Sequence, residues 1–118
     1  MKYIIDMIDD LRENIANSTE YGLLAMLLKE DDQKNLQNVG EKVITSLQVN
    51  HEAKALELGF EDENSTTKEL LEMLNTLEIQ SMMYEVVLKI SDKHPIMPVV
   101  GFGENHEKKQ YVFLVTTN

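Results

Sequence analysis

The sequence predicts an α+β fold in which three to four N-terminal helices pack on a small antiparallel sheet that contains a C-terminal β-hairpin. Apolar residues recur at helical spacing through the first half of the chain, whereas the C-terminal segment alternates like two β-strands. A length of 118 residues is enough for one hydrophobic core. We therefore expect residues 1–118 to form a single α+β domain; the alternative is a mainly α-helical body with one appended hairpin.

The first two segments are both compatible with helix. In residues 3–15 the apolar side chains follow a helical period, and the opposite face is acidic, which predicts an amphipathic helix with a solvated back. That acidic face comprises Asp6, Asp9, Asp10 and Glu13. Residues 21–28 would place apolar side chains all round a helix, so a buried helix and a buried strand both remain open. Their leucine, alanine and methionine content favours helix.

The middle of the chain also predicts helix. Asp31 and Asp32 can cap a helix whose apolar residues are spaced three, four and four apart. These residues are Leu36, Val39, Val43 and Leu47. Residues 51–60 continue or restart this helix, and we expect Gly59 to end it as a left-handed C-cap.

Helix and strand alternate in the second half of the sequence. Thr66 and Glu69 have the spacing of a capping box and begin a helix over residues 66–77. Residues 84–90 alternate apolar and polar side chains, which predicts a strand, although a second helix also fits. Residues 99–103 and 110–117 form a β-hairpin around a polar loop. A phosphate-binding loop at "GFGENH" is disfavoured because no helix follows the glycines.

The predicted hairpin is apolar on both faces. Tyr111 and Phe113 lie on one face and Val112 on the other, yet a lone hairpin is marginal in water. Helices, a third strand or a second copy of the chain must therefore cover it. Gly101 and Gly103 share one face and make a flat area that another backbone or a ligand could approach.

Composition excludes several classes of function. The formal net charge of −10 repels phosphate backbones and anionic lipid surfaces, so we expect neither nucleic-acid nor membrane partners. Cysteine is absent, which excludes disulfides, thiolate catalysis and cysteine-based metal sites. The apolar run at the N-terminus is too short for a signal-peptide core, and we expect a cytoplasmic protein.

Three patterns that resemble functional sites have simpler structural explanations. Residues 61–72 place oxygen-bearing side chains at EF-hand offsets, but Thr66 stands where that loop needs glycine. The histidines His51, His94 and His106 lack the paired spacing of a zinc motif. Ser91, Asp92 and His94 are too close in sequence to converge as a catalytic triad, and they predict a turn. We therefore predict no catalytic residue, no metal ligand and no cofactor site.

The function predicted from these observations is a non-enzymatic protein-interaction module of the adaptor, chaperone, immunity or inhibitor type. Its acidic charge suits a basic protein partner, its apolar hairpin face suits docking, and we expect a homodimer. The predicted interface consists of Met82, Met83, Gly101, Phe102, Gly103, Tyr111 and Phe113. The alternative is a small regulatory domain that binds a metabolite between sheet and helices.

Overall fold

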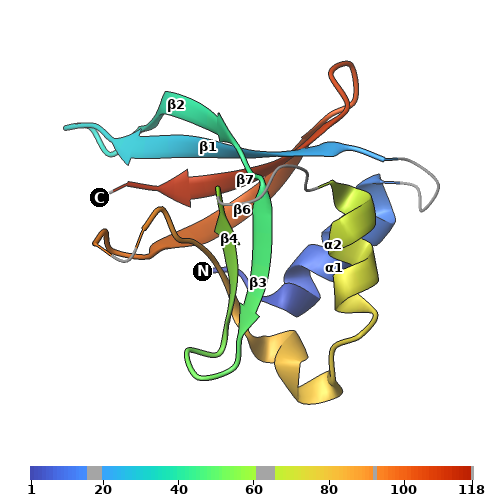
Figure 1. Cartoon of the computed structure of the whole chain (residues 1–118). Coiled ribbons are helices and arrows are strands. Elements are labelled where there is room, and N and C mark those ends of the chain that lie inside the picture. Colours follow the sequence, from blue (N-terminus) through green and yellow to red (C-terminus); the bar gives the residue numbers. More distant parts are fainter. Residues whose placement is uncertain (16–19, 61–65, 92, 118) are drawn as a thin grey trace.

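The computed structural model describes residues 1–15, 20–60, 66–91 and 93–117, which form two α-helices, one short 3-10 helix and seven strands (Figure 1). The helices are α1 (Ile4–Asn14), α2 (Thr67–Leu74) and the 3-10 helix η1 (Ile79–Met83). The strands are β1 (Gly22–Glu30), β2 (Leu36–Val43), β3 (Ser46–Asn50), β4 (Ala55–Gly59), β5 (Glu85–Leu88), β6 (Met97–Asn105) and β7 (Gln110–Thr116).

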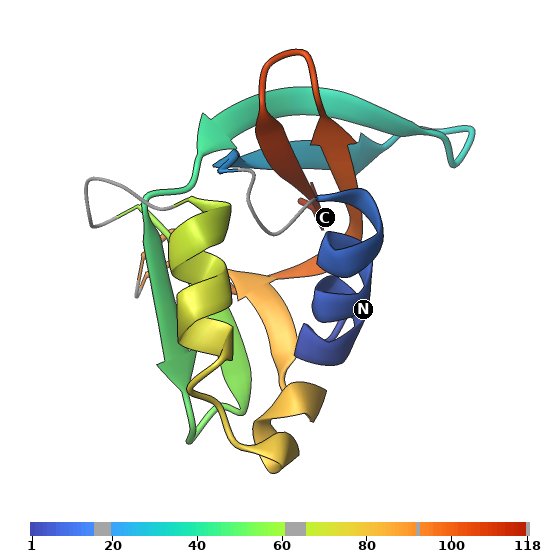
Figure 2. The same ribbon diagram turned by 90° about the vertical axis from the view of Figure 1, so that its right-hand side faces the viewer.

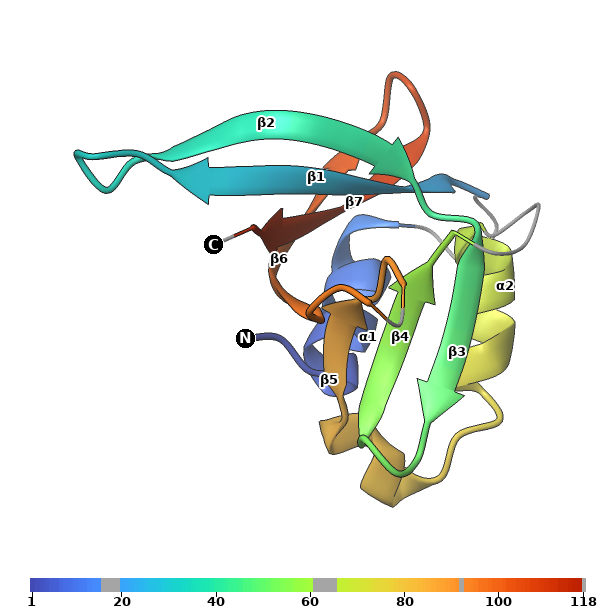
Figure 3. The same cartoon turned by 60° about the vertical axis from the view of Figure 1, so that its left-hand side comes forward.

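The strands form one mixed sheet in the order β2-β1-β7-β6-β5-β4-β3. The β1·β7 and β4·β5 pairs are parallel, and the other neighbours are antiparallel. A parallel pair needs a long crossover, which α2 and η1 provide between β4 and β5. β6 joins two parts of the sheet, because Met97 and Pro98 pair with β5 and the residues after them pair with β7. Figure 3 shows β1 and β2 running across the direction of β3 and β4.

Both α-helices lie on the same side of this sheet (Figure 2), and the core fills the space between. Ile4, Met7 and Leu11 of α1 are buried, as are Leu70 and Leu74 of α2. They join buried strand residues in one cluster that includes Leu23, Leu56, Leu58, Val86, Leu88, Val99, Tyr111, Phe113 and Val115. The strand side chains on this inner face alternate with side chains on the outer face, as the pleat requires.

The predicted proportions of helix and sheet are wrong. Seven strands and two α-helices replace the expected three to four helices on a small antiparallel sheet, and the mainly α-helical alternative is wrong as well. Residues 21–28 fall largely in β1, where β2 and β7 flank the strand on both sides. Leu23, Leu24 and Ala25 are consecutive and all buried, so apolar residues on both faces of an interior strand produced the continuous run that resembled a buried helix.

The predicted helix over the middle of the chain is also wrong. Its expected apolar seam is split between β2 and β3, and Leu36, Val39 and Val43 are 54%, 54% and 56% exposed. A bulge opposite Leu27 and Leu28 interrupts the β2 register, which hides strand alternation in the sequence. Asp31 accepts hydrogen bonds at 2.9 Å from two backbone amides of the β1–β2 turn, so its side chain closes a turn and caps no helix.

Gly59 ends strand β4 and caps no helix. It pairs with Ser46 of β3, and a Cβ atom at Gly59 would lie 2.6 Å from the Ser46 hydroxyl oxygen. Glycine is needed here for close approach between strands, not for a left-handed helix end, since its φ is not positive.

Three local predictions are confirmed, although the helix predicted over residues 66–77 ends earlier, at Leu74. The N-terminal helix is α1, and the helix predicted from residue 66 is α2 with its capping box between Thr66 and Glu69. Hydrogen bonding from the Thr66 side chain lowers the pKa of Glu69. The predicted C-terminal hairpin is formed by β6 and β7. Strand and helix were both left open for residues 84–90, and Glu85–Leu88 form strand β5.

Candidate functional site

A groove between the two helices is lined by five apolar and two polar side chains. Spacing of four residues places Ile8 and Arg12 on one side of α1. α2 contributes Leu71 and Leu74, and its C-terminal end continues into the segment that leads to η1 (Figure 2). The groove has a volume of about 620 Å³ and is lined by Ile8, Arg12, Leu71, Leu74, Asn75, Leu77 and Met82. Three elements therefore converge on a space of the size that small ligands and peptide side chains occupy.

Exposed apolar side chains continue from this groove along η1. Ile79 is 88% exposed and Met83 is 61% exposed, and both flank Met82 in the same short helix. A 3-10 helix of one turn and a half cannot turn all of its side chains inward, and here only Ser81 is buried. We call the groove together with Ile79 and Met83 the groove surface. Large apolar groups gathered in this way are typical of interaction sites.

Arg12 is the one cationic residue in the lining of the groove. It lies in the last turn of α1, where the negative end of the helix dipole favours a cation. No ion pair or side-chain hydrogen bond joins Arg12 to another described residue, although Asp9 and Glu13 lie near it in the sequence. The guanidinium group is therefore available to an anionic group of a ligand in the groove.

A second hollow, of about 580 Å³, lies on the other side of α2. It is lined by Leu47, Gln48, Val49, His51, Met73, Thr76, Leu77 and Glu78. Leu77 lines both hollows, so the segment that follows α2 lies between them.

The structure separates the interface residues expected from the sequence. Met82 lines the groove, and Met83 follows it in η1 and is 61% exposed. Tyr111 and Phe113 are 0% exposed, with Phe102 packed against their rings at centroid distances of 6.0 and 5.9 Å. The surface proposed below therefore includes neither Tyr111 nor Phe113.

The two glycines of the hairpin lie on the opposite side of the sheet from these rings. Gly101 pairs with Leu114 and Gly103 with Val112, whereas Phe102 pairs with Phe113 on the inner face. A Cβ atom at Gly103 would meet nothing within 4 Å. The flat area expected from the sequence is thus on the outer face, away from both helices.

A polar cluster ties α1 to the hairpin. The buried hydroxyl of Tyr111 donates a hydrogen bond of 2.8 Å to Asp10. The pKa of Tyr111 is raised mainly by burial and, to a smaller extent, by this hydrogen bond. Glu104 lies opposite Tyr111, and one of its carboxylate oxygens is buried without a hydrogen-bond partner among the described residues. Burial and the nearby charge of Asp10 raise the pKa of Glu104. Asp10 therefore anchors the helix and is not merely part of a solvated face.

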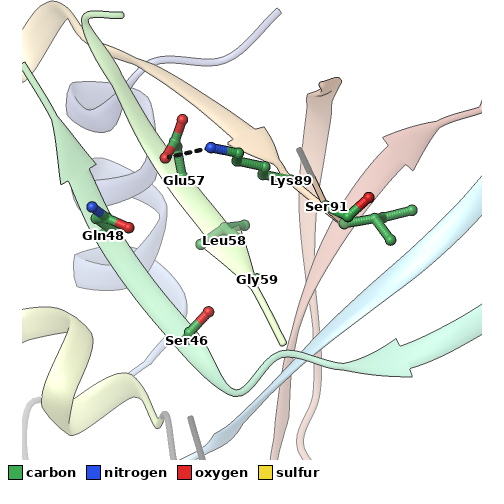
Figure 4. A pocket seen from close by; sticks show the side chains of 8 residues that line it. Ser46, Gln48, Glu57, Leu58, Gly59, Lys89 and Ser91 are labelled. Carbon is green, nitrogen blue, oxygen red and sulfur yellow. Dashed lines mark ion pairs between the residues drawn. The ribbon is translucent and has the colours of Figure 1, made fainter. Parts of the chain in front are cut away.

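Glu57 is the other buried carboxylate, and it lies on the outer face of the sheet (Figure 4). It is 6% exposed and forms an ion pair of 3.8 Å with Lys89. Asn50 approaches it at 3.4 Å. The hollow beside it has a volume of only about 50 Å³, which is too small for a metabolite. The ion pair is best explained as a link between the β4 strand and the segment after β5.

The histidines lie apart from one another. His106 bonds the Tyr21 hydroxyl at 2.6 Å, His51 bonds Tyr84 at 3.0 Å, and His94 bonds Ser91 in an exposed turn. Asp92 and residues 61–65 of the EF-hand-like loop lie outside the described residues. Within the described ranges, no three histidine, aspartate or glutamate side chains are grouped to hold a metal ion.

No known protein family matches the sequence, and comparisons with curated proteins and with solved structures gave no match. None of the helices in the described ranges is both long and apolar enough to cross a bilayer. Sequence reasoning missed Arg12, Leu71 and Ile79 as site residues. The only signal was a cation on the border of an apolar helix face, a pattern that ordinary surface helices share.

Proposed function

We propose that this chain is a non-enzymatic protein-interaction module that receives an apolar segment of a partner on the groove surface. The observation that carries the proposal is the convergence of α1, α2 and η1 on an open groove, with Ile79 and Met83 of η1 88% and 61% exposed in the same short helix as the lining residue Met82. Amphipathic helices commonly bind proteins by laying an apolar face in such a groove. Methionine suits this role because its flexible, polarizable side chain adapts to differently shaped partners.

Charge supports a protein partner that is basic overall. The net charge of −10 creates a long-range field that accelerates encounter with a positively charged protein. The groove surface then supplies the short-range contacts, since apolar burial contributes most of the binding free energy. We also propose that the protein is cytoplasmic, and fractionation of source cells tests this location.

A double variant tests the groove surface with little risk to the fold. Ile79→Ser with Met83→Ser removes two exposed apolar side chains, so we expect unchanged thermal stability and loss of the partner captured by the wild-type chain. Ile96→Ser is the matched control, because Ile96 is also apolar and 46% exposed but precedes β6 and does not line the groove. Equal capture by wild type and the double variant would contradict the proposal, as would equal loss in the control.

The same groove supports one alternative, a regulatory domain that binds a metabolite between the helices. Its volume of about 620 Å³ lies in the usual range of small-molecule sites. A thermal-shift screen of metabolites against the wild-type chain separates the two functions. A stabilising compound whose effect disappears with Leu71→Ser, in a chain that captures no protein, would favour the metabolite.

A further inference from the structure

We infer that the partner segment in the groove carries a carboxylate, from an acidic side chain or a free C-terminus, that pairs with Arg12. This inference rests on the proposed function and specifies the chemistry of its ligand. The groove lining combines five apolar side chains with Asn75 and a single cation, the exposed Arg12, so a segment that contacts the whole lining meets one positive charge. A segment with one carboxylate among apolar residues can pack against the apolar side chains and pair with Arg12 at the same time.

The position of Arg12 limits where the carboxylate must lie. Arg12 is four residues after Ile8 on α1, so its guanidinium group borders the end of the groove nearest the C-terminus of that helix. Asn75 lies beyond the C-terminal end of α2, so its amide adds a second polar group toward the other end of the lining. A planar guanidinium group binds a carboxylate in two parallel hydrogen bonds, which a lysine cannot do.

The net negative charge of the chain repels an acidic ligand, but this repulsion acts mainly at long range. At physiological salt, exposed charges more than about 8 Å apart are largely screened, whereas a carboxylate in contact with Arg12 is not. A partner can therefore be basic overall and still present one acidic residue within its apolar docking segment. The expected recognition pattern is apolar residues at helical spacing with a single Asp or Glu at a fixed position.

A peptide-display selection tests this inference. Random 12-residue peptides are selected on the full-length wild-type chain at 150 mM salt and then measured against Arg12→Gln and Lys68→Gln. Both variants remove one positive charge, but Lys68 is exposed on α2 and does not line the groove. We expect the selected peptides to be apolar, with either one acidic residue at a fixed position or an apolar C-terminus. They should bind Arg12→Gln about five-fold more weakly, which is the largest effect usual for an exposed ion pair. Their binding to Lys68→Gln should be unchanged.

Four other outcomes would contradict the inference, and one of them would also contradict the proposed function. Peptides whose affinity falls with Ile79→Ser and Met83→Ser but does not change with Arg12→Gln would contradict the carboxylate contact. Such peptides would leave the proposed function intact. Selection of basic peptides, or equal losses in both charge variants, would overturn the inference as well. The absence of any peptide directed to the groove surface would overturn both the inference and the proposed function.

Discussion

Replacing Tyr111 with phenylalanine should destabilise the protein measurably, because it removes the hydrogen bond that ties α1 to the sheet. The Tyr111 side chain is fully buried, and its hydroxyl donates to Asp10 at 2.8 Å. A hydrogen bond to a charged acceptor contributes about 1.5–3 kcal/mol net. Asp10 is only partly buried and can regain a water molecule, so we take the lower end, about 1.5 kcal/mol. For a domain of this length the change corresponds to a fall of roughly 6 °C in Tm.

Urea denaturation followed by circular dichroism measures this change, and Tyr84→Phe is its control. The Tyr84 hydroxyl bonds His51 at 3.0 Å in an exposed pair, so its loss should cost less than about 0.5 kcal/mol. A double-mutant cycle with Asp10→Asn should return a coupling of about 1 kcal/mol. A Tyr111→Phe variant as stable as the wild type, or a cycle without coupling, would refute the assignment of Asp10 as the anchor of α1.

Three further predictions concern pH, turns and association. Because burial and Asp10 raise the pKa of Glu104 above its ordinary 4.5, the folded state holds this proton more tightly than the unfolded state. Glu104→Gln should therefore exceed wild type in stability at pH 7, and denaturation across pH should show the gain shrinking toward pH 4.5; a constant difference would contradict the cause. Lys109→Gly should raise the free energy of unfolding by up to about 1 kcal/mol, measured by thermal unfolding, because Lys109 has a φ of 53° that glycine adopts without strain. Lys108→Gly should not stabilise the protein. Light scattering over a dilution series should show a dimer that Val39→Lys disrupts, because Val39 is exposed on the edge strand β2; a monomer at every concentration would contradict self-association.

The hairpin turns explain much of what the sequence could not reveal. Three turns contain a residue with positive φ, and in each it is a lysine: Lys34, Lys54 and Lys109. Turn recognition relies on glycine and asparagine at such positions, so the β1–β2 and β3–β4 hairpins carried no signal. Without turns, the spacing of Leu36, Val39 and Val43 resembled a helix. The β6–β7 hairpin was predictable because its strands are long and apolar on both faces.

Long-range pairing determined the remaining elements. β1 is a strand because β2 and β7 supply its hydrogen-bonding partners, and intrinsic helix propensity is too weak to resist that context. α1 and α2 depend on local patterns and were predicted correctly, whereas the local pattern of residues 84–90, which contain β5, left strand and helix both open. The groove between α1 and α2 arises only after the chain folds, because its lining residues are separated by about sixty positions in sequence. Met82 and Met83 were recognised as candidates because adaptable apolar side chains are identifiable without a structure.

Site-specific photocrosslinking tests the groove surface most directly. Benzoylphenylalanine is introduced at Ile79, which is 88% exposed beside the groove, or at Glu107, which is exposed in the β6–β7 turn. After irradiation in source cells, we predict a discrete crosslinked protein from position 79 that is absent from position 107 and is lost when Met83→Ser is added. The same crosslinks from both positions, or none from position 79, would contradict a partner-binding role for the groove surface.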